Sequence, residues 1–144
     1  GKKMSNLGFD AMLKMLGGSR DSVKALTTAL GKTIKAVVID ENDILRFEFE
    51  DGYNLQIADA GQDCCERRYM RTDDDLNAFV GATLLGIELV DAPNVAEDHE
   101  VQFLHVQTSD GRFTCSSHNE HNGYYGGFAI VCSEEPVVLS VRQS

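Results

Sequence analysis

The stretch that decides the fold is residues 31–57, GKTIKAVVIDENDILRFEFEDGYNLQI, in which apolar and polar residues alternate with a period of two. This alternation predicts one β-strand over 33–40 and a second over 44–50. Asp51-Gly52 favours a tight turn, because glycine accepts the positive φ that such turns require. The return strand is expected over 53–57, which makes the whole stretch a three-stranded antiparallel meander.

The same phrase occurs a second time further along the chain. Gly31-Lys32-Thr33-Ile34 is echoed by Gly81-Ala82-Thr83-Leu84, and Asp110-Gly111 repeats the turn at Asp51-Gly52. The strand pattern recurs over 101–108 and its return over 113–117. The sequence therefore predicts an internal duplication, with two three-stranded antiparallel β-meanders forming one sheet or a partly closed barrel.

Helical periodicity is confined to the beginning of the chain. Apolar spacings of three and four residues predict one helix over 7–16 and a second that begins at Ser19 or Asp21 and ends before Gly31. A short helix over 76–80 and a further strand over 128–132 complete the pattern. We expect an α+β fold in a single structural domain, with an N-terminal helical arm over 1–30 and a duplicated β domain over 31–144.

The 144-residue chain carries a formal net charge of −10, which disfavours binding to duplex nucleic acid. The charge either serves solubility or imitates the phosphates of a nucleic acid. No secretory signal and no membrane-length apolar run is visible, and the four cysteines do not form a disulfide framework. We expect a cytoplasmic protein with free thiols and no membrane partner.

One segment with possible chemistry is Asp63-Cys64-Cys65-Glu66-Arg67-Arg68-Tyr69-Met70-Arg71. The cluster of Arg67, Arg68 and Arg71 on an acidic chain suggests an anion site, because guanidinium groups bind phosphate or carboxylate with paired hydrogen bonds. The alternative is that these arginines pair with Glu66 and with the acidic run 73–75.

Cys64 and Cys65 are open to three interpretations. They are small apolar packing residues, or one is a thiolate nucleophile activated by the nearby arginines, or they join His118 and His121 in a zinc site. No paired Cys-x-x-Cys supports the zinc site, and the common hydrolase, Walker and Rossmann motifs are absent. We expect no metal, no cofactor and no catalytic residue.

The second segment is His118-Asn119-Glu120-His121-Asn122-Gly123-Tyr124-Tyr125-Gly126-Gly127. Asn119 and Asn122 offer donors and acceptors to polar edges, Tyr124 or Tyr125 can stack on a flat ring, and glycines allow close approach. Arg112 is expected to join them. The alternative is a long β connection whose glycines serve only its turns.

These two segments resemble a family of uncharacterised domains found in bacteriophages and bacteria. The matching residues are Gly61, Asp63, Cys64, Cys65 and Glu66 in the first motif, and Asn119 with 122–127 in the second. The chain departs from that pattern after Cys65, where it has Glu-Arg-Arg-Tyr. In size and architecture it is also similar to the Thoeris anti-defence sponges, which implies binding of a nucleotide second messenger.

The expected function is therefore that of a phage-type, non-enzymatic, homo-oligomeric protein. It would sequester a nucleotide-derived immune signal, such as a cyclic ADP-ribose isomer or a cyclic oligonucleotide. One alternative is an acidic inhibitor of a host defence enzyme that acts through protein contacts. A second alternative is an enzyme that uses Cys64 or Cys65 with His118 or His121. A third is a purely structural module.

Overall fold

A computed structural model describes residues 20–59, 67–92, 99–120, 128 and 130–134. The described elements follow in this order: α2 (Arg20–Ala29), β1 (Ile34–Ile39), β2 (Leu45–Phe49), β3 (Asn54–Asp59), β4 (Arg67–Thr72), the 3₁₀-helix η1 (Leu76–Phe79), β5 (Leu84–Asp91), β6 (His99–Thr108), β7 (Gly111–Glu120) and β8 (Ile130–Glu134).

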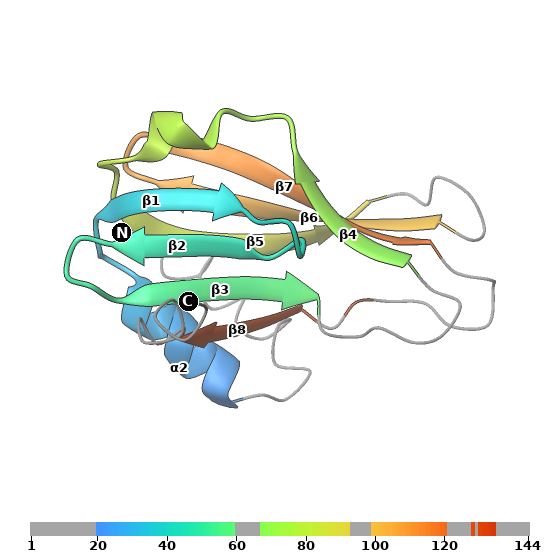
Figure 1. The fold of residues 1–144 in the computed structure, drawn as a ribbon, viewed down its shortest axis with the longest axis horizontal. Coiled ribbons are helices and arrows are strands. Elements are labelled where there is room, and N and C mark those ends of the chain that lie inside the picture. The colour runs from blue at the N-terminus through green and yellow to red at the C-terminus, as the bar shows by residue number, and fades with distance from the viewer. Residues whose placement is uncertain (1–19, 60–66, 93–98, 121–127, 129, 135–144) are drawn as a thin grey trace.

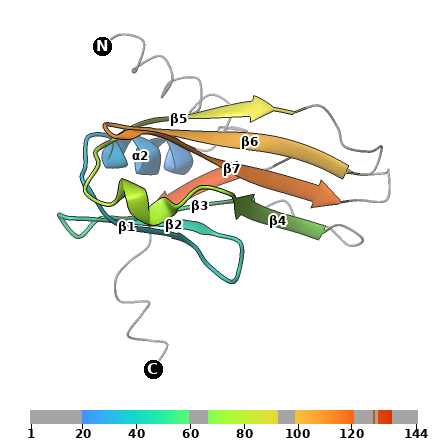
Figure 2. The same cartoon turned by 90° about the horizontal axis from the view of Figure 1, so that it is seen from above.

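The eight described strands form two antiparallel sheets of four strands each (Figure 1). Sheet I has the order β1-β2-β3-β8, and sheet II has the order β4-β7-β6-β5. Seen from above, the β1-β2-β3 meander and the β5-β6-β7 meander lie in different layers (Figure 2). The expected α+β fold with two N-terminal helices and one sheet or partly closed barrel is therefore wrong. The described fold is mostly β, with one α-helix and two sheets.

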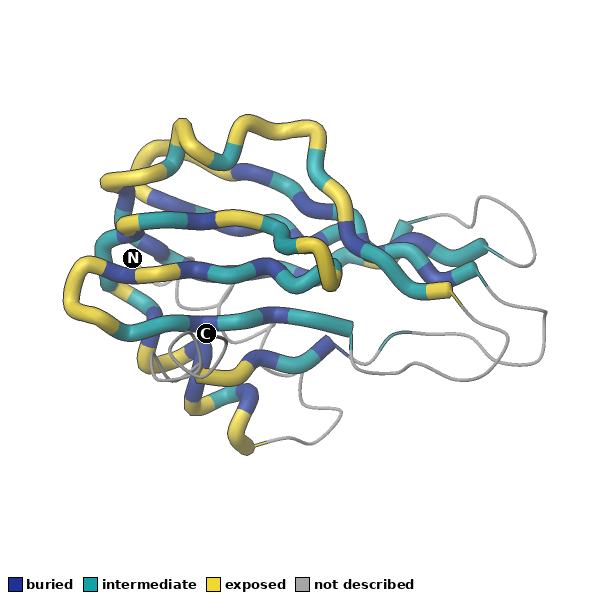
Figure 3. The backbone as a smooth tube through the Cα atoms, viewed as in Figure 1, coloured by how far each residue is buried: buried dark blue, intermediate teal, exposed yellow. Residues whose placement is uncertain are grey.

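The apolar rows of the two meanders explain why two sheets form. Each meander has one apolar face and one polar face, so a single extended sheet would leave its whole apolar face exposed to water. Phe47 and Phe49 of β2 stack on each other at 5.7 Å between ring centroids, and Phe47 meets Phe113 of β7 at 6.3 Å. The two apolar faces thus cover each other, and the buried backbone positions lie along the facing strands (Figure 3).

The two copies of the repeat meet at a pair of reciprocal hydrogen bonds. The N–H of Gly31 donates to the carbonyl of Leu84 at 2.8 Å, and the N–H of Gly81 donates to the carbonyl of Ile34 at 2.8 Å. Thr33 and Thr83, fifty positions apart, form an antiparallel bridge with each other. Equivalent residues therefore face each other, as they would around a local two-fold axis.

The fourth strand of each sheet comes from the other half of the chain. After the first meander, β4 pairs with β7 of sheet II, and after the second, β8 pairs with β3 of sheet I. This exchange of strands ties each half of the chain to both sheets. The two preceding helices both contact sheet I, because α2 contacts β8 and β3, and η1 contacts β1.

The predicted helices have different outcomes. The helix expected over 7–16 lies outside the described residues. The helix expected from Ser19 or Asp21 is confirmed as α2, whose Ser22 hydroxyl accepts the N–H of Cys132 at 3.0 Å and so fixes the helix to β8. The short helix expected over 76–80 is η1, capped by the Asp75 carboxylate, which accepts the N–H of Asn77 at 3.1 Å. Within the described residues, no helix is both long enough and apolar enough to cross a membrane.

Candidate functional site: the ring face of sheet II

The face of sheet II that points away from sheet I carries an unusual set of side chains. Strand pairing places alternate residues of β4, β7 and β6 side by side on this face. We call it the ring face and define it by Arg67, Tyr69, Arg71, Thr114, Ser116, His118, Glu120, His99, Phe103 and His105. It contains three of the four histidines of the chain.

Tyr69 and His118 lie side by side at one end of the ring face. Their rings are parallel, with 4.6 Å between centroids and 4° between planes. The guanidinium carbons of Arg67 and Arg71 lie over the tyrosine ring, 4.9 and 5.0 Å from its centroid. Both arginines are exposed, and neither has a carboxylate within ion-pair distance among the described residues. Two cationic groups are thus held beside a stack of flat rings.

Glu120 orients the tyrosine. The phenol of Tyr69 donates a hydrogen bond to the Glu120 carboxylate at 2.5 Å. Burial and this hydrogen bond raise the pKa of Tyr69, and the same bond, ahead of the charges of Arg67 and the nearby histidines, lowers the pKa of Glu120. The ring is therefore a neutral phenol anchored by an ionised carboxylate at neutral pH.

A second set of contacts fixes His118. Its Nδ1 lies 3.0 Å from Nε2 of His99, and its Nε2 lies 2.9 Å from the Ser116 hydroxyl. Burial, then the nearby His99 and Arg71, lower the pKa of His118, so its imidazole is neutral at pH 7. A neutral ring with both nitrogens engaged is a good stacking surface and a poor cation.

A second pair of rings lies further along the same face. Phe103 and His105 are nearly parallel, with 6.0 Å between centroids, and Nδ1 of His105 lies 2.8 Å from the Thr114 hydroxyl. A hollow of about 260 Å³ lies between this pair and Arg71, and Arg71 and Phe103 both line it. Its lining residues are Arg71, Thr72, Asp73, Asp74, Phe103, Thr114 and Ser116.

The residues expected to form the site are divided between the two faces of sheet II. Arg67 and Arg71 lie on the ring face, and the exposed Arg112 lies on the same side further along β7. Arg68 points inward, and its Nη1 donates to both carboxylate oxygens of Asp59 of β3, at 2.9 and 2.8 Å, in an ion pair in which both side chains are less than a tenth exposed.

The asparagine and tyrosine predictions have mixed outcomes. Asn119 is opposite Arg68 in the strand pairing and is fully buried. The other three predicted site residues, Asn122, Tyr124 and Tyr125, lie outside the described residues. The structure therefore brings the described parts of the two predicted segments together on the neighbouring strands β4 and β7. Their outward-facing side chains lie on the ring face.

Sequence reasoning overlooked Tyr69, His99, Phe103 and His105. The signal was available in the alternation of Arg67, Tyr69 and Arg71 with Arg68, Met70 and Thr72, which is the period of a strand. The strand is hard to recognise in the sequence because its outward residues are charged or aromatic and only Met70 is a typical core residue.

The cysteines of the described residues are not candidates for chemistry. Cys115 and Cys132 are buried, and burial raises the pKa of each thiol to about 12. Cys64 and Cys65 lie outside the described residues, as does His121. No group of three potential metal ligands is found within the described residues.

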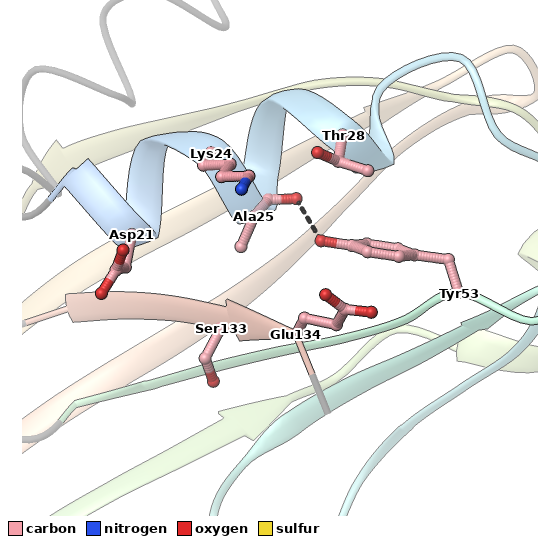
Figure 4. A pocket seen from close by; sticks show the side chains of 7 residues that line it. All are labelled: Asp21, Lys24, Ala25, Thr28, Tyr53, Ser133 and Glu134. Carbon is pink, nitrogen blue, oxygen red and sulfur yellow. Dashed lines mark hydrogen bonds between the residues drawn. The ribbon is translucent and has the colours of Figure 1, made fainter. Parts of the chain in front are cut away.

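Another cavity, of about 490 Å³, lies between α2 and the neighbouring ends of β3 and β8 (Figure 4). Its lining residues are Asp21, Lys24, Ala25, Thr28, Tyr53, Ser133 and Glu134. The Tyr53 phenol is engaged in the fold, because it donates to the carbonyl of Ala25 at 2.9 Å and so joins sheet I to the helix. The Tyr53 ring packs tilted by 33° against Phe49, whereas the Tyr69 ring is parallel to His118 and has two guanidinium groups over it, so the ring face is better suited to an anionic, flat ligand.

A family model described as "Domain of unknown function (DUF7448)" matches residues 27–131. The chain belongs to the DUF7448 family. The match begins in the last turn of α2 and ends in β8, so the DUF7448 region contains both meanders and the described part of the ring face. No curated protein and no solved structure matches the chain.

Proposed function

We propose that this DUF7448 protein binds a small phosphorylated ligand with a flat ring, and that it does so without catalysis. The observation that carries the proposal is the parallel Tyr69–His118 stack with Arg67 and Arg71 beside it. Aromatic platforms next to arginines are typical of sites that bind bases and phosphates together.

The geometry supports specific roles for these residues. The ligand ring takes the place of a guanidinium group over Tyr69, and the displaced arginine turns to the phosphate. This exchange is inexpensive because both arginines are exposed and each is held by an aromatic contact worth about 0.5–1 kcal/mol at an exposed site. Arg68 has no part in this binding, since its charge is already neutralised by Asp59.

The biological role that we propose is the withholding of a nucleotide-derived immune signal. It rests on the resemblance in size to anti-defence sponges and on a site whose rings and exposed arginines suit a base and a phosphate. The net charge of −10 supports a small ligand, because a long polyanion would be repelled by the rest of the surface.

The test is isothermal titration calorimetry with adenine nucleotides, ADP-ribose and cyclic dinucleotides. Tyr69→Ala should weaken the best ligand about tenfold to hundredfold, because base stacking on an aromatic side chain is worth about 1–3 kcal/mol. Tyr69→Phe keeps the ring and should bind nearly as well as the natural protein.

Gln56→Ala is the matched control, since Gln56 lies on a strand of sheet I and hydrogen-bonds only across to Ser133 among the described residues. Equal affinity of Tyr69→Ala and Gln56→Ala for every ligand bound would contradict the proposal. Binding of a host protein in place of any nucleotide would favour the acidic inhibitor.

A further inference from the structure

We infer that the ligand of the ring face has two flat rings joined through phosphate, as in a dinucleotide. This inference rests on the proposed function and names the class of ligand. The observation behind it is the second ring pair, Phe103 and His105, which a ligand with one ring bound at Tyr69 would not contact.

The distance between the two ring pairs suits two linked rings. Val101 is opposite His118 in the β6–β7 pairing, and Phe103 is two residues further along β6. Tyr69 therefore lies two strands away from Phe103 and two residues along, which corresponds to about 12 Å between their positions on the sheet. One base cannot stack at both places, whereas the two bases of an extended dinucleotide can.

The hollow between the two ring pairs has the groups that a linker needs. Arg71 lines it from β4 and can bind the bridging phosphate, while Thr114 and Ser116 of β7 also line it, with hydroxyls that fix His105 and His118. Its volume of about 260 Å³ accommodates a sugar-phosphate linker and is small for a second complete nucleotide.

A carboxylate at the edge of the hollow adds a preference for sugars. Asp74 is engaged in the fold, because it accepts the N–H of Thr114 at 2.7 Å. Asp73 is exposed and lines the same hollow, so it can accept hydrogen bonds from ribose hydroxyls, as acidic residues do in dinucleotide sites. Arg112 adds positive charge near His105 at the far end, where it contributes to lowering the pKa of that histidine, after burial.

The experiment compares adenosine monophosphate, linear ApA dinucleotide, cyclic di-AMP and a ten-nucleotide adenine strand by calorimetry at constant ionic strength. The natural protein should bind cyclic di-AMP or ApA at least tenfold more tightly than the monophosphate. Phe103→Leu keeps an apolar side chain but removes the ring, so it should lose about tenfold for the dinucleotides and leave the monophosphate unchanged. Tyr69→Ala should weaken all of them.

The outcomes separate the inference from the function on which it rests. If Tyr69→Ala weakens all ligands and Phe103→Leu weakens none, the two-ring inference is wrong and the single-ring function stands. If no nucleotide binds the natural protein, the proposed function itself fails. Affinity that continues to rise from ApA to the ten-nucleotide strand would overturn the inference of a dinucleotide ligand. It would favour a surface that binds single-stranded nucleic acid. Preference for cyclic di-AMP over ApA would identify a free messenger, rather than a strand end, as the source of the two rings.

Discussion

The outer faces of the two sheets differ far more than their inner faces. On sheet I, the described outward residues include two polar pairs, Arg46 with Asp40 and Lys35 with Glu48 at 3.6 Å, together with the exposed Val38. On sheet II, the equivalent surface is the ring face, with its two ring pairs. The inner faces are alike, since both supply aromatic and aliphatic side chains to a single core.

This difference indicates that the two sheets of the duplicated fold differ mainly in the residues of their outer faces. The inner faces must fit each other, so substitutions there are limited by packing. The outer faces have no such constraint, and that of sheet II has collected half-buried rings and exposed arginines. The comparison can be tested by substitutions that affect both sheets, one sheet, or one outer face.

The largest effect is expected at the ion pair between Arg68 and Asp59, which joins the inner faces of the two sheets. Asp59→Ala or Arg68→Ala should lower the free energy of unfolding by about 3–5 kcal/mol, because either change leaves an uncompensated buried charge. The double variant Arg68→Met, Asp59→Leu should recover most of this loss. Urea denaturation at pH 7 measures all three.

The control for this prediction is Lys35→Ala on the outer face of sheet I. Its ion pair with Glu48 is about half exposed and should contribute no more than about 1 kcal/mol. A loss for Arg68→Ala as small as that of Lys35→Ala would mean that the inter-sheet pair does not hold the sheets together.

A smaller and symmetrical effect is expected at Gly31 and Gly81, where the two repeats meet. Their φ values are +88° and +94°, and a Cβ atom added to either would meet no other atom within 4 Å. Substitution by alanine should therefore cost only the left-handed backbone energy, about 1–2 kcal/mol at each position. Thermal or urea unfolding of the two single variants should show the same loss; a loss at one glycine alone would break the symmetry between the repeats.

Much of the frame could be predicted from the sequence, because a meander leaves local signals. The alternation in 44–50 and the glycine turns at Gly52 and Gly111 mark strands and hairpins that the structure contains. The partners of β4 and β8 carry no such signal. Whether a strand joins the sheet before it or the sheet after it depends on packing between distant segments, which local periodicity does not record.

The site was harder to predict than the frame for a related reason. Arg67, Arg68 and Arg71 look equivalent in the sequence, but the period of two turns Arg68 toward Asp59 and the other two outward. The first ring pair joins Tyr69 of β4 to His118 of β7, 49 positions apart, and becomes visible only when the strand register is known. The second pair, Phe103 and His105, lies two residues apart on β6.

The smallest effect is expected from pH, and near neutral pH it comes from histidines of the ring face. The pKa of His118 is lowered in the folded protein by burial and then by His99 and Arg71, so below the ordinary value of 6.5 the unfolded chain binds more protons at this residue. The stabilisation from neutral His118 is present above pH 6.5 and is lost as the pH falls below 6.5 and through the lowered pKa. His105 has a pKa shift of the same sign. Glu120 contributes only at lower pH, because its lowered pKa starts from 4.5.

His118→Gln isolates this contribution, because glutamine keeps two hydrogen-bonding atoms and does not titrate. The difference in free energy of unfolding between pH 7 and pH 5.5, measured by urea denaturation, should be smaller in His118→Gln than in the natural protein. Gln56→Ala on sheet I should leave that difference unchanged. If His118→Gln retains the full pH dependence, the histidine is charged or freely solvated in the folded state. The assignment of His118 as a neutral stacking ring of the ring face would then be wrong.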